Sequence, residues 1–376
     1  MEILVVQRRL THYRLPFFET LRTQCHAAGI RLRLAHGVGT NQELGKADSG
    51  DLPWSEKLDT RYFLSGRLCW QPYRHLLRDV DMVVVTHENK LINNLFTQYL
   101  NHKVRLGLWG HGANLQGNPN DLRERFKRVA ARRADWWFAY TDMSLPLVQS
   151  SGFPADRTTV LNNAIDTGEL ARQFAAVTPE KLAKLKTEIG LRGGQTGLYL
   201  GSLYAEKRVD FMLTAAQAIK AKVPGFEFLI VGSGEDRPKV ESFCQQHEWA
   251  HYLGVKKGQD KADVLALANI IINPGLVGLG ILDSFVCGVP MVTTDCRLHS
   301  PEIAYLENGI NGLMTSDALE PYVDAVSMLL STPRRLGELR AGCLQSASKY
   351  TVDNMARNFV EGVEHCLALP KYRGSR

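Results

Sequence analysis

The 376-residue sequence contains no long hydrophobic run. No stretch approaches the roughly 18 uninterrupted apolar residues that a membrane-spanning helix needs, so we expect no transmembrane helix. The first residues, MEILVVQRRL, place two arginines after a short apolar run, which is the reverse of a secretory signal. We therefore expect a cytoplasmic protein, with any membrane contact peripheral and at the inner face of the membrane.

The sequence also lacks a cysteine framework and a strong excess of charge. Its seven cysteines are scattered and form no CxxC pair, so neither a disulfide framework nor a zinc site is indicated. The net charge of +6 is a mild bias, compatible with anionic substrates or a membrane surface. With 44% hydrophobic and 22% charged residues the chain has the composition of an ordinary globular protein, which excludes the disordered and fibrous classes.

What the sequence does contain is one pattern that occurs twice: a short apolar run, a polar loop and an amphipathic helix. The runs lie at residues 3–6 and 196–201, and the helices begin near Pro16 and Asp210. Such alternation predicts parallel βαβ units, whose strands are buried on both faces and rich in Val, Ile and Leu. Further strands of this kind are expected at residues 30–35, 82–86, 104–109, 136–140, 227–231, 270–273 and 291–294.

The pattern predicts an α/β protein made of two doubly wound, Rossmann-like domains that face each other across a cleft. The polar, turn-rich residues 162–167 place the junction, giving an N-terminal domain of residues 1–164 and a C-terminal domain of residues 165–349. The final helix, within residues 350–376, is expected to pack back onto the first domain. Residues 40–72 show no clear period, which is more typical of a functional insert than of a linker.

The most informative segment is residues 273–293, NPGLVGLGILDSFVCGVPMVT. It predicts a strand end, a glycine-rich loop, a helix, a tight turn and a second strand. A glycine-rich loop that opens a helix offers backbone N–H groups and the positive end of the helix dipole to an anion, typically phosphate. Gly278 and Gly280 either cradle such a phosphate or form a tight packing turn that admits no side chain.

This segment resembles the nucleotide-sugar site of glycosyltransferase family 4, a family of retaining enzymes with the GT-B fold. Other segments resemble the family in the same order, so that the match covers most of residues 194–330; they are GSLYAEKRVD at 201–210, FLIVGSG at 228–234, HYLG at 251–254, PEI at 301–303 and ENGING at 307–312. The resemblance implies transfer of a sugar from a nucleotide-diphosphate donor, a UDP-sugar, to a hydroxyl of a glycan or lipid-linked glycan in cell-surface polysaccharide or lipopolysaccharide synthesis. It implies no metal and no cofactor, and no DxD pair sits in a suitable loop.

The resemblance also implies site residues. Lys207 would neutralise the leaving diphosphate, and His111, after the strand at 104–109, would lie near the donor sugar. Asp283 suits a ribose hydroxyl; the other donor-binding residues implied are Ser202, Arg208, Gly232, Leu253, Gly254, Gly275, Val277, Gly278 and Leu279.

Two of these positions depart from the family. Its first glutamate falls on Gly275 and its diphosphate-facing arginine on Ser202, with Arg208 or Arg297 as candidate replacements for the arginine.

The first domain offers candidate acceptor-side residues at strand ends. His87 and Glu88 follow the strand at 82–86, and His12 and Arg14 lie in the first loop. With Arg8 and Arg9 that loop is strongly cationic. Three interpretations are open: the loop faces an anionic acceptor, it faces the donor phosphates, or it is an exposed surface loop.

Residues 122–134 are basic and amphipathic, which suits an anionic membrane surface or the solvated face of a packed helix. No pattern of aromatic and basic residues indicates nucleic-acid binding.

Two other functions remain open on the sequence. A nucleotide-sugar epimerase of the same architecture would need acid and base residues in the cleft that we cannot assign. A non-catalytic nucleotide-sugar-binding protein is the other alternative, and Gly275 and Ser202, where the family carries functional side chains, are its motivation.

Overall fold

The computed structural model describes residues 1–45, 48–88, 90–100, 103–111 and 132–372. The chain divides into two compact units: the first comprises Met1–Asp166 and Thr351–Arg376, and the second comprises Thr167–Tyr350. None of the helices within the described ranges is long and apolar enough to cross a membrane.

The first unit is built on a seven-stranded sheet with the order β3-β2-β1-β6-β7-β8-β9. Every neighbouring pair is parallel. Because β1 lies in the middle, the chain extends the sheet first to one side and then to the other, which makes the sheet doubly wound. The strands are β1 (Glu2–Gln7), β2 (Arg31–His36), β3 (Glu56–Lys57), β6 (Met82–Thr86), β7 (Arg105–Gly110), β8 (Trp136–Ala139) and β9 (Thr158–Val160).

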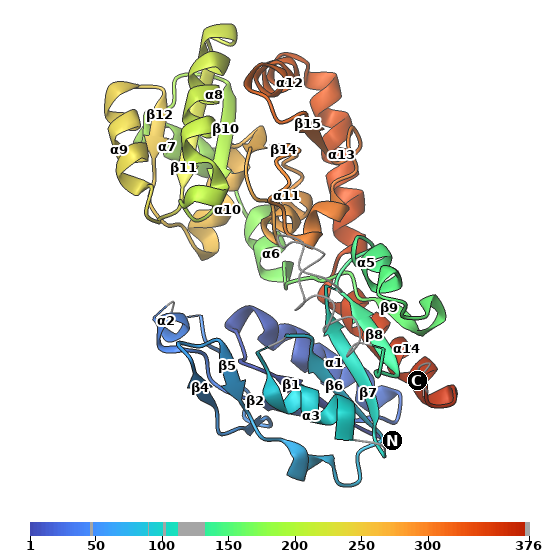
Figure 1. Cartoon of the computed structure of the whole chain (residues 1–376). Helices are drawn as coiled ribbons and strands as arrows, with labels where there is room; N and C mark the ends of the chain where they lie inside the picture. The colour runs from blue at the N-terminus through green and yellow to red at the C-terminus, as the bar shows by residue number, and fades with distance from the viewer. Residues whose placement is uncertain (46–47, 89, 101–102, 112–131, 373–376) are drawn as a thin grey trace. The chain divides into compact units, whose positions relative to one another are not determined.

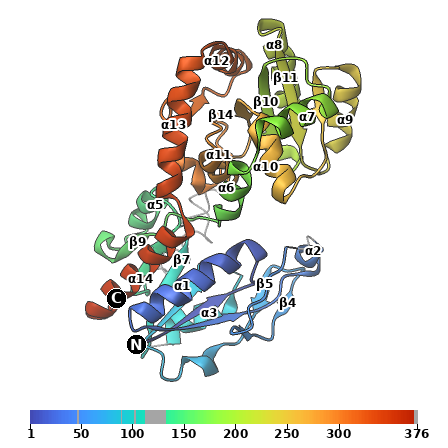
Figure 2. The ribbon, with the colours of Figure 1, turned by 180° about the vertical axis from the view of Figure 1, so that it is seen from behind.

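Two helices from opposite ends of the chain cover one face of this sheet. Helix α1 (Leu15–Ala27) and helix α14 (Val352–Ala368) lie side by side (Figures 1 and 2), and their contacts are numerous. Phe359 of α14 stacks on Phe138 of β8 with ring centroids 4.4 Å apart and contacts Phe17 of α1. The C-terminal helix is therefore part of the first unit's core, held there by buried aromatic area.

The opposite face is covered by shorter elements. A second apolar cluster joins alternate residues of β1, β6 and β7 to Tyr73, Val148 and Phe153. The elements on this side and in the connections are α3 (Ile92–Leu100), α5 (Ser144–Ser150) and the 3-10 turns η1 (His12–Arg14), η2 (Arg74–Leu77) and η3 (Ala155–Arg157).

The stretch of residues 40–72, which shows no sequence period, contains short elements. It forms the one-turn helix α2 (Asn41–Leu44), the edge strand β3 and an antiparallel pair, β4 (Arg61–Phe63) and β5 (Leu68–Trp70). The helix is closed by a capping box between Thr40 and Glu43. Elements of two to four residues are too short to show a hydrophobic period, so their type could not be predicted from the pattern.

The second unit repeats the doubly wound plan with a six-stranded sheet in the order β12-β11-β10-β13-β14-β15. All pairs are again parallel. β11 is buried along its whole length, as expected for a strand covered by helices on both faces. The strands are β10 (Gln195–Leu200), β11 (Phe226–Val231), β12 (Ala250–Tyr252), β13 (Ile270–Ile272), β14 (Met291–Thr294) and β15 (Gly312–Thr315).

Helices of the second unit form its two outer layers. A large apolar cluster joins α8 (Val209–Lys222) and α12 (Leu319–Ser331) to the sheet. Helices α10 (Gly258–Leu267) and α11 (Gly280–Cys287) contact α6 (Gly168–Ala175), and α11 also packs on α13 (Pro333–Lys349). The remaining elements are α7 (Pro179–Ile189), α9 (Arg237–Gln246), η4 (Ala205–Lys207) and η5 (Pro301–Tyr305). The predicted α/β fold with parallel sheets is confirmed.

Candidate functional site

In the second unit, two loops meet at the carboxyl ends of β10 and β13. Residues 201–208 follow β10, and the glycine-rich loop 274–279 follows β13. The amide N–H of Leu276 donates to the carbonyl of Glu206 at 2.9 Å, and Nζ of Lys207 donates to the carbonyl of Leu276 at 2.5 Å. Lys207 and the glycine-rich loop, which the resemblance pairs, are therefore in direct contact.

Gly275 lies where the two loops touch. A Cβ atom at this position would come 2.5 Å from the carbonyl carbon and oxygen of Lys207 and 2.6 Å from the carbonyl oxygen of Glu206. Such distances are far below van der Waals contact, so a glutamate here would force the loops apart. The close approach of the two loops is the physical reason why this chain has glycine where the family carries its first glutamate.

Gly278 and Gly280 are in open surroundings. A Cβ at Gly278 would make only ordinary contacts, the nearest being 3.5 Å from Oγ of Ser300, and a Cβ at Gly280 would meet nothing within 4 Å. Packing therefore does not require glycine at either position. Within the described ranges the backbone amides of Gly278 and Leu279 donate to no other group. The loop thus presents open backbone N–H groups at the start of α11, which is the chemistry of an anion site.

Lys207 is a partly buried cation without an acidic partner among the described residues. No carboxylate of the described residues lies within ion-pair distance of its ammonium, which is held by the Leu276 carbonyl alone. Burial lowers the pKa of Lys207 to about 8. An ammonium in such surroundings gains from any anion that enters the loop, because the anion compensates the lost hydration.

His299 holds the glycine-rich loop in place, and the sequence analysis missed it. Its Nδ1 accepts the amide N–H of Val277 at 3.1 Å, and its Nε2 lies 2.8 Å from the carbonyl of Thr294. The amide of Ser300 donates in turn to the carbonyl of Val277 at 2.9 Å. The only available signal was a histidine shortly after the predicted strand at 291–294, which by itself is weak.

Asp283, in the first turn of α11, is paired with a lysine that the sequence analysis did not identify. Nζ of Lys261 on α10 lies 2.8 Å from Oδ2 of Asp283, and the aspartate is 7% exposed. Burial raises the pKa of Asp283, and the ammonium of Lys261 opposes that rise. The ion pair therefore favours the charged carboxylate, which is the form that accepts hydrogen bonds from hydroxyls.

Arg208, a candidate replacement for the missing arginine, is already engaged. Its guanidinium donates to Oγ1 of Thr294 at 3.0 Å and forms an ion pair with Asp317. It therefore ties the loop after β10 to β14 instead of offering free charge. Ser202 is exposed, and its carbonyl accepts the hydroxyl of Tyr199 at 2.7 Å.

Gly232, Leu253 and Gly254 meet at the carboxyl ends of β11 and β12. The amide of Gly232 donates to the carbonyl of Gly254 at 2.9 Å, and the amide of Leu253 donates to Ile230 of β11. A Cβ at Gly232, whose φ is +145°, would lie 1.7 Å from the carbonyl oxygen of Gly201. Only glycine permits the turn after β11 to approach the loop after β10 this closely.

In the first unit, the candidate residues lie at the carboxyl ends of β1, β6 and β7. The ring of His111 stacks on Tyr140 with centroids 4.1 Å apart, and His87 meets the edge of Trp137 at 4.8 Å. His12 is exposed, and its Nδ1 lies 3.3 Å from the carbonyl of Asp48. These strand ends form one edge of the sheet, where open α/β sheets bind ligands.

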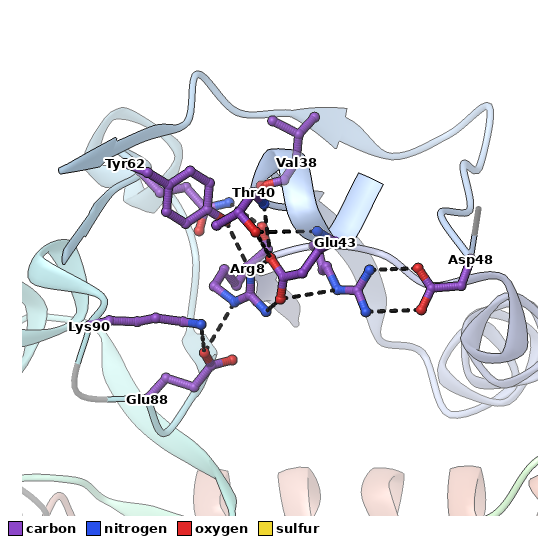
Figure 3. A network of polar contacts seen from close by, with 10 residues as sticks. Arg8, Val38, Thr40, Glu43, Asp48, Tyr62, Glu88 and Lys90 are labelled. Atoms are coloured by element: carbon purple, nitrogen blue, oxygen red, sulfur yellow. Dashed lines mark hydrogen bonds and ion pairs between the residues drawn. The ribbon is translucent and has the colours of Figure 1, made fainter. Parts of the chain in front are cut away.

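The first loop is not a free cationic surface, contrary to one reading of its sequence. Arg8 makes a bidentate contact with Glu43 at 2.6 and 2.8 Å and a further one with Glu88 at 3.1 Å (Figure 3). Arg9 makes a bidentate contact with Asp48 at 2.7 and 3.0 Å. The acids come from segments that follow β2 and β6, so only the fold reveals that these two charges are compensated.

Glu88 is held between two cations. Nζ of Lys90 lies 3.2 Å from the same carboxylate oxygen that Arg8 contacts, and the Glu88 side chain is 35% exposed. The hydroxyl of Tyr62 accepts from Arg8 at 3.0 Å and donates to the carbonyl of Val38 at 2.8 Å (Figure 3). The network joins Val38, Glu43 and Tyr62 to Arg8 and Glu88, which follow β1 and β6.

The predicted residues fall into two sets. Lys207, Gly275, Val277, Gly278 and Leu279 lie together in the second unit, whereas His12, Arg14, His87, Glu88 and His111 belong to the first unit. Most of the basic segment 122–134 lies outside the described residues. No group of His, Cys, Asp or Glu residues suited to a metal ion occurs among the residues described.

Comparison with known proteins locates a family match in the second unit. Residues 194–332 match the family described as "Glycosyl transferases group 1". The chain is 26% identical over 186 residues to alpha-D-kanosaminyltransferase of Streptomyces kanamyceticus, covering 46% of this chain and 45% of that protein. It is 21% identical over 191 residues to alpha-monoglucosyldiacylglycerol synthase of Acholeplasma laidlawii, covering 49% of this chain and 47% of that protein. The alignments thus span about half the length of these relatives.

Solved structures are similar over the whole chain. The Anabaena protein HepE in complex with UDP aligns with a TM-score of 0.71 at 14% identity, covering 97% of this chain and all (100%) of that one. WaaG, a glycosyltransferase involved in lipopolysaccharide biosynthesis, aligns with a TM-score of 0.61 at 13% identity, covering 96% and 99%. The chain therefore has the GT-B fold of two Rossmann-like domains, and its second unit carries the match to the group 1 glycosyltransferases.

Proposed function

We propose that this protein is a retaining glycosyltransferase that moves a sugar from a UDP-sugar to a hydroxyl of a glycan or lipid-linked glycan. The observation that carries the proposal is the partly buried Lys207 ammonium, which has no acidic partner among the described residues and touches the glycine-rich loop. The family match of residues 194–332 and the UDP complex of the structurally similar HepE support the donor class.

The chemistry needs few groups. The bond between the sugar and the diphosphate breaks, the acceptor oxygen bonds to the sugar from the same face, and the hydroxyl proton passes to the departing diphosphate. Lys207 and the open amides of Gly278 and Leu279 would stabilise the charge that develops on the diphosphate. Asp283, kept charged by Lys261, would accept a ribose hydroxyl.

In this proposal the first unit binds the acceptor, and His111 acts near the donor sugar. The half-exposed Glu88 carboxylate, at the carboxyl end of β6, would accept a hydrogen bond from an acceptor hydroxyl. The names of two similar proteins, an alpha-monoglucosyldiacylglycerol synthase and a glycosyltransferase involved in lipopolysaccharide biosynthesis, support a place in cell-surface glycan synthesis.

The test is transfer from labelled UDP-sugars to a panel of glycan and lipid-linked acceptors. We expect transfer with retention of configuration, and loss of at least about a hundredfold in Lys207→Ala, since electrostatic stabilisation of a leaving group is worth several kcal/mol. Lys184→Ala, at an exposed lysine of α7, is the matched control and should transfer normally. Isomerisation of the donor without acceptor would indicate an epimerase, and saturable binding without turnover would indicate a binding protein. Near-normal transfer by Lys207→Ala would contradict the assignment of the lysine.

A further inference from the structure

Arg14 differs from the other arginines of the first loop. Arg8 and Arg9 are saturated by carboxylates, whereas no carboxylate of the described residues lies within ion-pair distance of Arg14. The Arg14 guanidinium instead lies over aromatic rings, 5.4 Å from the centroids of both Tyr13 and Trp109 and 6.0 Å from that of Tyr140. Within the part of the chain that the structure describes, the guanidinium makes one hydrogen bond, to Sδ of Met355, which is long at 3.8 Å.

Aromatic rings fix a guanidinium without neutralising it. The ring faces attract the cation and exclude water from one side, but its N–H groups keep their capacity to donate to an oxyanion. Arg14 is therefore held in position while its charge stays available.

The tryptophan under Arg14 has a buried donor that is not used. Nε1 of Trp109, which is 2% exposed, has no hydrogen-bond partner among the described residues. Within the same part of the chain Gln7 Nε2, Thr86 Oγ1 and Thr141 Oγ1, at or near the carboxyl ends of β1, β6 and β8, also have none. Buried polar atoms are normally paired, so unpaired ones along one sheet edge point to a place where a ligand can bind.

The start of helix α1 adds no acid to this environment. The 13-residue helix begins at Leu15, directly after Arg14, and its first turn contains no acid. The amide of Leu15 already donates to the carbonyl of His12, and Pro16 has no N–H, so the contribution of the helix is the positive end of its dipole beside the guanidinium.

We propose that Arg14 binds a phosphate group of a substrate at the carboxyl edge of the first unit's sheet. The inference rests on the proposed glycosyltransferase function, which it deepens. A guanidinium fork at the positive end of a helix dipole, with no acid beside it, is complementary to the several oxygens of a phosphate. The phosphate belongs either to the donor diphosphate or to a phosphate-bearing acceptor, such as a sugar phosphate or a lipid phosphate.

Binding is tested with inorganic pyrophosphate and UDP on the full chain labelled with 15N-tryptophan. The Trp109 indole lies beside Arg14, so its N–H signal in the NMR spectrum, assigned with Trp109→Phe, reports on this site separately from the Lys207 site. We expect a saturable shift of that signal in the wild type. Arg14→Met should weaken the pyrophosphate response by at least about tenfold, as expected for loss of a bidentate charged contact, and Arg14→Lys should restore part of it.

The matched control is Arg22→Met. Arg22 lies on the same helix and over a tryptophan ring, 4.7 Å from that of Trp54, so its removal costs the same charge and the same type of ring contact. It should leave the Trp109 response unchanged. An equal loss in both variants would show a general effect of net charge and would overturn the proposal. A Trp109 signal unmoved by either ligand, while UDP still binds at Lys207, would overturn it too and leave the proposed function intact. UDP binding nowhere would refute the proposed function itself.

Transfer kinetics identify the source of the phosphate. If it is the donor's, Arg14→Met raises the KM for the UDP-sugar. If it is the acceptor's, the variant raises the KM for a phosphorylated acceptor and leaves that for its dephosphorylated analogue unchanged. Unchanged KM values for both substrates would overturn the assignment to a substrate phosphate. Thermal unfolding of Arg14→Met and Arg14→Lys, both expected near the wild-type midpoint, separates this effect from loss of the fold.

Discussion

Raising the pH should weaken nucleotide binding through Lys207. Burial lowers the pKa of this lysine from 10.5 to about 8, so its charge is lost at a pH where exposed lysines keep theirs. A bound diphosphate favours the ammonium form and must therefore raise the pKa again. Binding is thus coupled to proton uptake, and the coupling grows as the pH rises through the pKa of the free protein.

The size of the effect follows from the titration. With a pKa of about 8, the protonated fraction falls from roughly nine-tenths at pH 7 to roughly one-tenth at pH 9. If only the ammonium form binds tightly, the affinity for UDP falls about tenfold over that range, or about 1.4 kcal/mol. Roughly half a proton is taken up per UDP bound at pH 8. The phosphate itself, whose second pKa is about 6, is already ionised over this range.

The assay is calorimetric titration with UDP between pH 7 and 9.5, repeated at pH 8 in buffers of different ionisation enthalpy. Lys207→Ala should bind weakly at every pH and lose the slope. Titration of Cys296 is the competing explanation for a pH-dependent affinity. Burial opposes formation of its thiolate, but the contact with His299 lowers the pKa of the thiol. Cys296→Ser should therefore keep the slope if the lysine causes it. A wild-type affinity that is flat from pH 7 to 9.5 would refute the reasoning.

Three further changes test the local geometry. Gly275→Ala places a methyl group 2.5 Å from the backbone of the lysine loop, so it should lower the thermal midpoint and weaken UDP binding, whereas Gly280→Ala, with nothing within 4 Å, should do neither. Lys261→Met leaves the Asp283 carboxylate buried without a cation, so the free energy of unfolding, measured with urea at pH 7, should fall by about 3 kcal/mol. A decrease of less than about 1 kcal/mol would argue against this ion pair. The hydrogen bonds from Arg8 lower the pKa of Glu43. The pair therefore stabilises the fold at pH values above 4.5, the pKa of this glutamate in the unfolded chain, and that stabilisation is lost as the pH falls below it. Wild type should therefore lose more stability than Glu43→Gln between pH 5 and 3, and equal losses in pH-dependent unfolding would contradict the pairing.

Hydrophobic runs predicted the sheets well where strands are long and fully buried. The strands expected at 82–86 and 291–294 coincide with β6 and β14, and the others that were expected differ by one or two residues at their ends. β9, β12 and β15 were not predicted, because they have three or four residues and only part of their surface is buried. Pro333 is the first residue of α13, directly after the end of α12 at Ser331, a position where its missing N–H costs nothing.

The site could be predicted only where its residues are close in sequence or share a family motif. The glycine-rich loop and Lys207 were found in this way. Lys261 and His299 were not, because each acts on a residue 22 positions away in a different element. The partners of Arg8 lie 35 and 80 positions away, which explains why the first loop looked cationic in the sequence. Charge compensation is a property of the tertiary structure, and a list of charged residues does not contain it.

This separation of charges also indicates where ligands act. Arg8, Arg9 and Arg208 are paired with carboxylates, and these ion pairs join segments that are distant in the sequence. A cation that is already paired gains little from a further anion, so these three arginines are poor candidates for binding a ligand. Lys207 and Arg14 lack an acid partner among the described residues, and each lies near the carboxyl ends of the strands of a parallel sheet. A partly buried cation without a counter-ion loses hydration that the fold alone does not restore, which is why we propose that a phosphate binds at each of them.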